Sequence, residues 1–197
     1  HKKGAEVVRE ITTYCAKIGI KYLTLYAFST ENWKRPKLEV EYLMKLLEKY
    51  LKEELEVYLE NNIRFRAIGD LSKFSKSLQN RILKTQELTS SCNGLTQVLA
   101  LNYGSKDEII RAIKKLNEKG LEVSEKNLES CLDTAGISPV DIMIRTSGEV
   151  RLSNYLLWQN AYAEMFFVQT YWPDFTKTEL DDIISDFSRR ERRFGAV

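Results

Sequence analysis

The chain has 197 residues, of which 43% are hydrophobic and 29% are charged, and its formal net charge is +2. This length suits one domain with a core of ordinary size, and the small net charge gives no reason to expect a nucleic-acid binder. Three scattered cysteines without a CxxC pair indicate reduced thiols in a cytoplasmic protein, and the single histidine excludes a His-rich metal site. The sequence shows no signal peptide and no membrane-spanning run.

The predicted elements alternate between helices and strands along the chain. Helical spacing of apolar residues and short β-branched or aromatic runs predict, in chain order, helix 3–18, strand 20–28, helix 38–59, strand 63–68, helix 72–89, strand 95–101, helices 105–118 and 124–132, strand 142–144, helix 154–163, strand 165–168 and helix 176–193. Alternation of this kind predicts an α/β fold with a mostly parallel sheet flanked by helices. No repeat or Pro/Gly-rich linker suggests a domain boundary.

Three polar loops follow predicted strands, at 29–35, 102–104 and 145–153. They carry arginines, amides and hydroxyls, among them Arg35, Asn32 and Asn102. Ligands of open parallel sheets bind beyond the carboxyl ends of the strands, so we expect the three loops to face one crevice.

The third loop has the composition of a diphosphate receptor. Arg145 and Arg151 bracket a hydroxyl-rich turn, and Ser153 stands at the expected N-cap of helix 154–163. Guanidinium groups donate forked, charge-assisted hydrogen bonds, and a helix N-terminus offers free N–H groups. The alternative is an exposed loop with two solvated arginines. The sequence lacks a P-loop, GxGxxG, HExxH and a nucleophile elbow, and the nearby tryptophan and long apolar helices favour a lipid diphosphate.

Five blocks of the sequence resemble the cis-prenyltransferases, with the bacterial undecaprenyl diphosphate synthases as the most similar branch. The blocks are HKKGA at 1–5, LTLYAFSTENWKRP at 23–36, NYG at 102–104, the segment 144–164, and RERRFG at 190–195. They occur in the family's order from the first residue nearly to the last, so the resemblance is specific.

The resemblance implies sequential cis-condensation of isopentenyl diphosphate onto farnesyl diphosphate, giving the undecaprenyl lipid carrier precursor for cell-wall synthesis. It also implies Mg²⁺, a homodimer, and a six-stranded, mostly parallel sheet in one domain over 1–197. The first strand of that sheet is expected in an N-terminal piece that this chain lacks. The enzyme is expected in the cytoplasm, with a peripheral place at the inner face of the membrane as an option, where it delivers its product without a transmembrane segment.

The resemblance also assigns roles to residues by position. Isopentenyl diphosphate would be held by Arg145, Arg151, Leu152 and Ser153, and the allylic diphosphate by His1 and Arg35. The substrate site would be lined by Ser29, Thr30, Glu31 and Trp33. Asn32 matches a position proposed as proton acceptor, and because an amide is a poor base it would act through Ser29, water or the leaving diphosphate. Glu164 matches a magnesium-associated glutamate, while Arg193 and Gly195 match the Arg-x-Gly that reaches the partner subunit's site.

Two departures leave alternatives open. The family's Asp-Gly-Asn-Gly-Arg-Trp stretch, which carries the main Mg²⁺-linked aspartate, would precede His1 and is absent here. Val150 stands where some members have histidine, which bears on any metal role there. The first departure is the only support for a non-catalytic partner subunit, which would supply only the terminal Arg-x-Gly. Retention of the other site residues argues against that alternative. A generic phosphate-binding α/β enzyme is a third possibility, but it ignores the long apolar helix.

Overall fold

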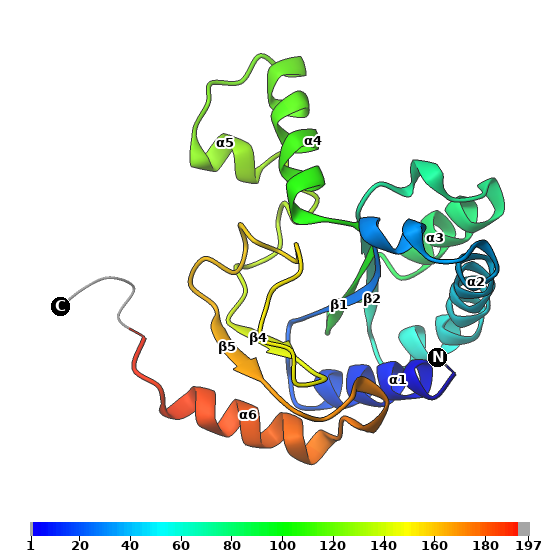
Figure 1. Ribbon diagram of the computed structural model, residues 1–197, viewed down its shortest axis with the longest axis vertical. Coiled ribbons are helices and arrows are strands. Elements are labelled where there is room, and N and C mark those ends of the chain that lie inside the picture. The colour runs from blue at the N-terminus through cyan, green and yellow to red at the C-terminus, as the bar shows by residue number, and fades with distance from the viewer. Residues whose placement is uncertain (1, 193–197) are drawn as a thin grey trace. The chain divides into compact units, whose positions relative to one another are not determined.

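The computed structural model describes residues 2–192, and these fall into two compact units, one of residues 2–14 with 138–192 and the other of residues 15–137. Figure 1 shows their helices and strands. The single domain expected over 1–197 stays a prediction.

The unit of residues 15–137 is built on a parallel sheet of β1 (Tyr22–Ser29), β2 (Arg64–Ile68) and β3 (Thr96–Tyr103). The strand order is β1-β3-β2, and Thr96 pairs with Tyr22 on one side and with Arg64 on the other. All eight residues of β3 are buried. A central strand covered on both faces needs a nearly continuous apolar run, which explains why this segment does not alternate.

Four helices and two short 3-10 turns accompany this sheet. They are α2 (Lys37–Glu60), α3 (Lys76–Leu88), α4 (Ser105–Glu118), α5 (Glu125–Glu129), η1 (Thr30–Lys34) and η2 (Leu71–Lys73). α2 and α3 lie side by side (Figure 1). α2 also packs on β2, where Tyr58 stacks on Phe65 with 5.8 Å between the ring centroids. The Ser75 hydroxyl begins α3 by accepting a hydrogen bond from Leu78 N at 3.2 Å.

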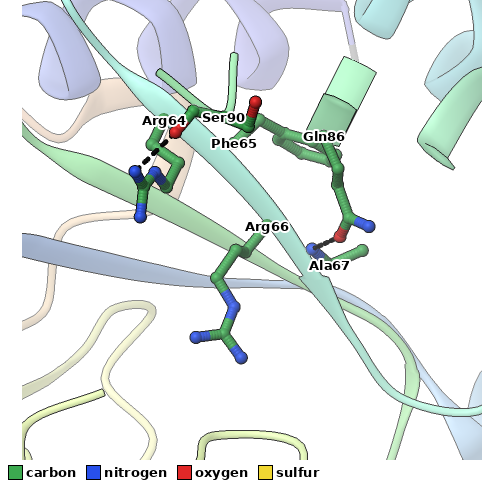
Figure 2. Close-up of a pocket in the computed structure, with 6 residues that line it drawn as sticks. All are labelled: Arg64, Phe65, Arg66, Ala67, Gln86 and Ser90. Carbon is green, nitrogen blue, oxygen red and sulfur yellow. Dashed lines mark hydrogen bonds between the residues drawn. The ribbon is translucent and has the colours of Figure 1, made fainter. Parts of the chain in front are cut away.

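Side chains from and just after α3 cap the free edge of β2. Gln86 Oε1 accepts a hydrogen bond from Ala67 N at 2.7 Å, and Thr89 Oγ1 accepts one from Phe65 N at 3.0 Å. A cavity of about 400 Å³ lies along this edge (Figure 2). Its two guanidinium groups are held by main-chain carbonyls, since Arg64 donates to Ser90 O and Arg66 to Asp133 O. This edge is thereby protected against strand pairing.

The other unit contains residues 2–14 of α1 (Lys2–Lys17), a parallel pair of β4 (Ile142–Arg145) and β5 (Glu164–Phe167), the turn η3 (Trp172–Asp174) and α6 (Lys177–Arg189). β4 and β5 pair from Ile142 opposite Glu164 to Arg145 opposite Phe167. Polar contacts join α1 to the C-terminal part, because Tyr14 OH lies 2.7 Å from the Asp181 carboxylate and Trp172 Nε1 donates to Gly4 O at 3.0 Å.

The predicted α/β class with parallel strands is confirmed. Every predicted strand is present with ends shifted by a few residues, in one sheet of three and one of two. The first strand of the expected six-stranded sheet was placed ahead of this chain, and that strand stays a prediction. The helix predicted over 124–132 shortens to α5, and the last helix ends at Arg189 instead of residue 193.

The prediction of a helix over 154–163 is wrong. Residues 153–162 form turns, with left-handed φ values of +50° at Ser153, +61° at Asn154 and +47° at Leu156. An α-helix of L-residues cannot include such φ values, and Ser and Asn readily bond to nearby main-chain groups instead of continuing a helix. Ser153 is therefore not a helix N-cap.

In the part of the chain that the structure describes, no helix combines the length and apolarity needed to cross a membrane.

Candidate active site

The loop after β1 is a compact turn fixed by its own amide. Asn32, in η1, accepts a hydrogen bond from Ser29 N through Oδ1 at 2.9 Å. This bond gives Asn32 a structural role at the start of the turn. It also uses one acceptor position of Oδ1, the atom that would accept the proton in catalysis. Thr30 and Glu31 lie in the same turn.

Trp33 is half-buried and packs against two aromatic rings. Its ring contacts Phe28 edge to face, with 5.1 Å between centroids, and Phe74 at 5.9 Å. Its Nε1 donates to Asn102 Oδ1 at 2.7 Å. The loops after β1 and β3 therefore meet, as expected for two of the three polar loops.

Arg35 begins the approach to α2. Its Nη1 pairs with Glu39 Oε1 at 2.7 Å, and 42% of its side chain is exposed. An exposed ion pair of this kind is weak, so the guanidinium can exchange its partner for a phosphate.

The loop after β4 is held by main-chain bonds to the segment that follows β5. Ser147 N donates to Thr170 O at 2.8 Å and Gly148 N to Val168 O at 2.9 Å. Gly148 has a φ of +70°, a conformation that favours glycine, and a Cβ there would lie 2.6 Å from Gln169 Oε1, the end of a flexible side chain.

This loop brings together the residues predicted to bind isopentenyl diphosphate. Arg145 Nη1 donates to Ser153 Oγ at 2.9 Å and to Arg151 O at 2.8 Å. Arg151 also pairs with Glu149, and 59% of its side chain is exposed. Two guanidinium groups and a hydroxyl thus lie on one exposed loop with Leu152. The helix N-terminus expected there is absent, so any phosphate bound there would depend on arginine and hydroxyl donors alone.

Glu164, the predicted metal ligand, is already paired. Its Oε2 lies 2.7 Å from Arg190 Nη1, and Arg190 also bonds Asp186. The hydrogen bonds to these two carboxylates raise the pKa of Arg190. The Arg190 guanidinium lies 4.1 Å from the centre of the Phe166 ring. Within residues 2–192, no three His, Cys, Asp or Glu side chains are grouped so as to hold a metal ion. The described residues therefore do not form a divalent-metal site by themselves.

The remaining predicted residues, His1, Arg193 and Gly195, lie outside the described residues. Arg192, just before them, pairs with Asp141 at 2.7 Å.

Sequence reasoning missed a network behind the loops after β2 and β3. Arg111 binds Asp133 through two hydrogen bonds of 2.8 and 2.6 Å, and Asp133 accepts one from Gly69 N at 2.9 Å. Glu108, which is fully buried, accepts hydrogen bonds from Tyr103 OH and Asp133 N. The sequence offered no signal for this network beyond charged residues in and after the predicted helix 105–118.

The fold is that of the cis-prenyltransferases, as the following comparisons show. A sequence model of the family described as "Putative undecaprenyl diphosphate synthase" matches residues 1–195. Isoprenyl transferase of Wolinella succinogenes is 64% identical over 197 residues, covering 100% of this chain and 86% of that protein. Isoprenyl transferase of Helicobacter pylori strain 26695 is 55% identical over 203 residues, covering 100% and 87%. The chain belongs to the undecaprenyl diphosphate synthase family and is an enzyme that elongates prenyl chains with cis geometry.

Solved structures agree. The crystal structure of a probable undecaprenyl diphosphate synthase from Campylobacter jejuni superimposes with a TM-score of 0.92 at 45% identity, covering 99% of this chain and 93% of that one. Lavandulyl diphosphate synthase from Lavandula x intermedia, in complex with dimethylallyl diphosphate, gives 0.93 at 34% identity, covering 99% and 87%. The family acts on isoprenyl diphosphates and needs a divalent metal.

Proposed function

We propose that this enzyme adds isopentenyl diphosphate units in sequence to farnesyl diphosphate, giving the long polyprenyl diphosphate from which the undecaprenyl carrier of cell-wall synthesis is made. The observation that carries the proposal is the cluster of Arg145, Arg151 and Ser153 on one loop, gathered by the two hydrogen bonds of Arg145 Nη1. With Leu152, these residues are proposed to hold isopentenyl diphosphate.

The allylic substrate is assigned to other residues. Arg35 and His1 are proposed to bind its diphosphate, and the site is proposed to be lined by Ser29, Thr30, Glu31 and Trp33. Arg193 and Gly195 are proposed to reach the partner subunit's site in a homodimer. The exposed side chains of Tyr162 and Met165, 66% and 37% accessible, support an interface around β5.

The reaction forms a carbon–carbon bond between the alkene of isopentenyl diphosphate and the allylic carbon. It breaks the allylic carbon–oxygen bond and releases one proton. Arginine donors neutralise the charge that develops on the leaving diphosphate, and holding the two substrates in line supplies much of the remaining rate. Asn32 already accepts a hydrogen bond from Ser29 N, so the proton is proposed to leave through Ser29, water or the diphosphate.

Mg²⁺ is the metal we propose, because diphosphate oxygens are hard ligands that suit it. Glu164 is its proposed protein ligand, although Arg190 holds that carboxylate here and the described residues alone do not complete a site. We further propose one domain over 1–197, a cytoplasmic enzyme, and delivery of the product to the inner face of the membrane.

The direct test is incubation of the intact protein with Mg²⁺, labelled isopentenyl diphosphate and farnesyl diphosphate. We expect label in a long prenyl product whose new double bonds are cis by NMR, and none when farnesyl diphosphate is omitted. The other candidate, a non-catalytic partner subunit, predicts no product from this protein alone at any concentration. That result would overturn the proposal.

A further inference from the structure

Asn102, at the end of β3, is a buried amide with an unusual backbone. Only 1% of the residue is exposed, and its φ is +47°. Asparagine tolerates this left-handed conformation better than most residues. The sequence pattern had placed Asn102 among polar groups facing the crevice, but burial this complete leaves its amide no surface on which to meet a ligand.

Both ends of this amide are used inside the protein. Asn102 Nδ2 donates to Asp70 O at 2.7 Å, and Asn102 Oδ1 accepts from Trp33 Nε1 at 2.7 Å. The main-chain oxygen of Asn102 accepts from Asp70 N at 3.3 Å. Since Asp70 follows β2 and Trp33 follows β1, one side chain joins the exits of all three strands of this sheet.

The hydrogen bond decides how the Trp33 ring is turned. Phe28 and Phe74 contact the Trp33 ring through apolar surfaces, and such contacts fix the direction of a ring less strictly than a directed hydrogen bond does. An indole has one N–H donor, and burying it without a partner is costly. The orientation that directs Nε1 at Asn102 Oδ1 pairs a half-buried donor with a buried acceptor, so Asn102 favours one rotamer of Trp33.

We infer that Asn102 is a positioning residue, which fixes the Trp33 indole as a wall for the isoprenoid chain of the allylic substrate. This inference rests on the proposed function, which places Trp33 at the substrate site. Asn102 touches neither substrate and acts through Trp33.

The first experiment observes the indole directly, by NMR of the tryptophan side-chain N–H groups in the intact protein. Trp33→Phe assigns the Trp33 signal by removing it. Asn102→Gly suits the left-handed φ while deleting the amide, and we expect it to shift the Trp33 signal. Asn102→Asp keeps an oxygen for Trp33, and a carboxyl that takes up a proton at this buried position can still donate to Asp70 O, so we expect that signal to stay near its original position. The Trp172 N–H, bonded to Gly4 O, is the internal control and should not move.

The second experiment separates KM from kcat. Loss of one neutral hydrogen bond should raise the KM for farnesyl diphosphate about fivefold in Asn102→Gly, with kcat nearly unchanged, and Asn102→Asp should restore most of the difference. In a Trp33→Phe background, Asn102→Gly should add little, since the pair acts as a unit.

An unshifted Trp33 signal in Asn102→Gly would overturn the inference. So would equal losses of kcat in the Gly and Asp variants with spectral changes throughout, because that pattern marks a merely structural residue. If the signal shifts but the KM for farnesyl diphosphate does not change, the KM of Trp33→Phe shows whether only this inference or also the proposed substrate site is wrong. A raised KM in Trp33→Phe means that the inference alone is wrong, and an unchanged KM means that the proposed substrate site is wrong as well.

Discussion

Among single residues, Asp133 is a largely buried carboxylate whose charge is balanced by several donors. Its side chain is 11% exposed. Burial by itself raises the pKa of this carboxyl, but the hydrogen bonds and charge of Arg111, with the N–H of Gly69 and the charge of Lys115, outweigh it and lower the pKa below its ordinary value of 3.8. The hydrogen bond from Ser72 lowers the pKa of Asp70 in the same way.

These shifts predict a loss of stability in acid. A carboxyl with a lowered pKa in the folded state contributes fully above its unfolded pKa, and the contribution disappears as the pH falls through the folded pKa. The free energy of unfolding should therefore decline as the pH drops below about 4, because the unfolded chain then binds more protons.

Asp133→Asn should cost on the order of 2 kcal/mol at pH 7 and flatten the acid limb of a denaturant-unfolding series. Asp182→Asn, at an exposed position on α6, is the matched control and should leave the series unchanged. An acid limb as steep in Asp133→Asn as in the parent protein would contradict this account of Asp133.

At the scale of elements, the exits of β2 and β3 pass so close that one of them needs glycine. Gly69, directly after β2, has a φ of +111°, and a Cβ there would lie 2.0 Å from Leu101 O. That oxygen belongs to the backbone of a buried strand and cannot move aside.

Gly69→Ala should therefore destabilise the protein by about 3 kcal/mol, the sum of left-handed strain and overpacking. Gly120→Ala is a sharp control, because Gly120 also has a positive φ, +62°, but meets no atom within 4 Å of its added Cβ. It should cost only about 1 kcal/mol. Equal losses in chemical denaturation would show that close approach of the strands does not matter.

The secondary-structure elements also show which parts of the fold could be predicted from the sequence. Strands such as β3 were predictable because a buried parallel strand needs a nearly continuous apolar run, here residues 98–101. The segment 153–162 was not, since its apolar spacing suits a helix while the left-handed φ values of Ser153, Asn154 and Leu156 arise from tertiary context. The residues Arg145, Arg151 and Ser153 were expected together and lie together. The pairing of Glu164 with Arg190, and the burial of Asn102, depend on packing that one sequence does not display.

At the scale of the whole molecule, and leaving aside His1, which lies outside the described residues, the two proposed substrates are assigned to residues of different compact units. Arg145, Arg151 and Ser153 belong to the unit with β4, whereas Arg35 and Trp33 belong to the unit with β1. That the loop after β4 faces the same crevice as the other two stays a prediction. The assignment nevertheless has a kinetic consequence, because a change in one group of residues should affect one substrate much more than the other.

The most direct test of the account is the KM of Arg145→Ala and Arg151→Ala for each substrate. Loss of a hydrogen bond to a charged group costs about 1.5–3 kcal/mol, so the KM for isopentenyl diphosphate should rise roughly 10- to 100-fold. The KM for farnesyl diphosphate should change less than about twofold, since the proposed assignment gives those donors no contact with it. Arg64→Ala, which removes a guanidinium bonded to a main-chain carbonyl instead, is the matched control and should alter neither constant. An unchanged KM and kcat for isopentenyl diphosphate in both variants would contradict the assignment of the Arg145–Ser153 loop.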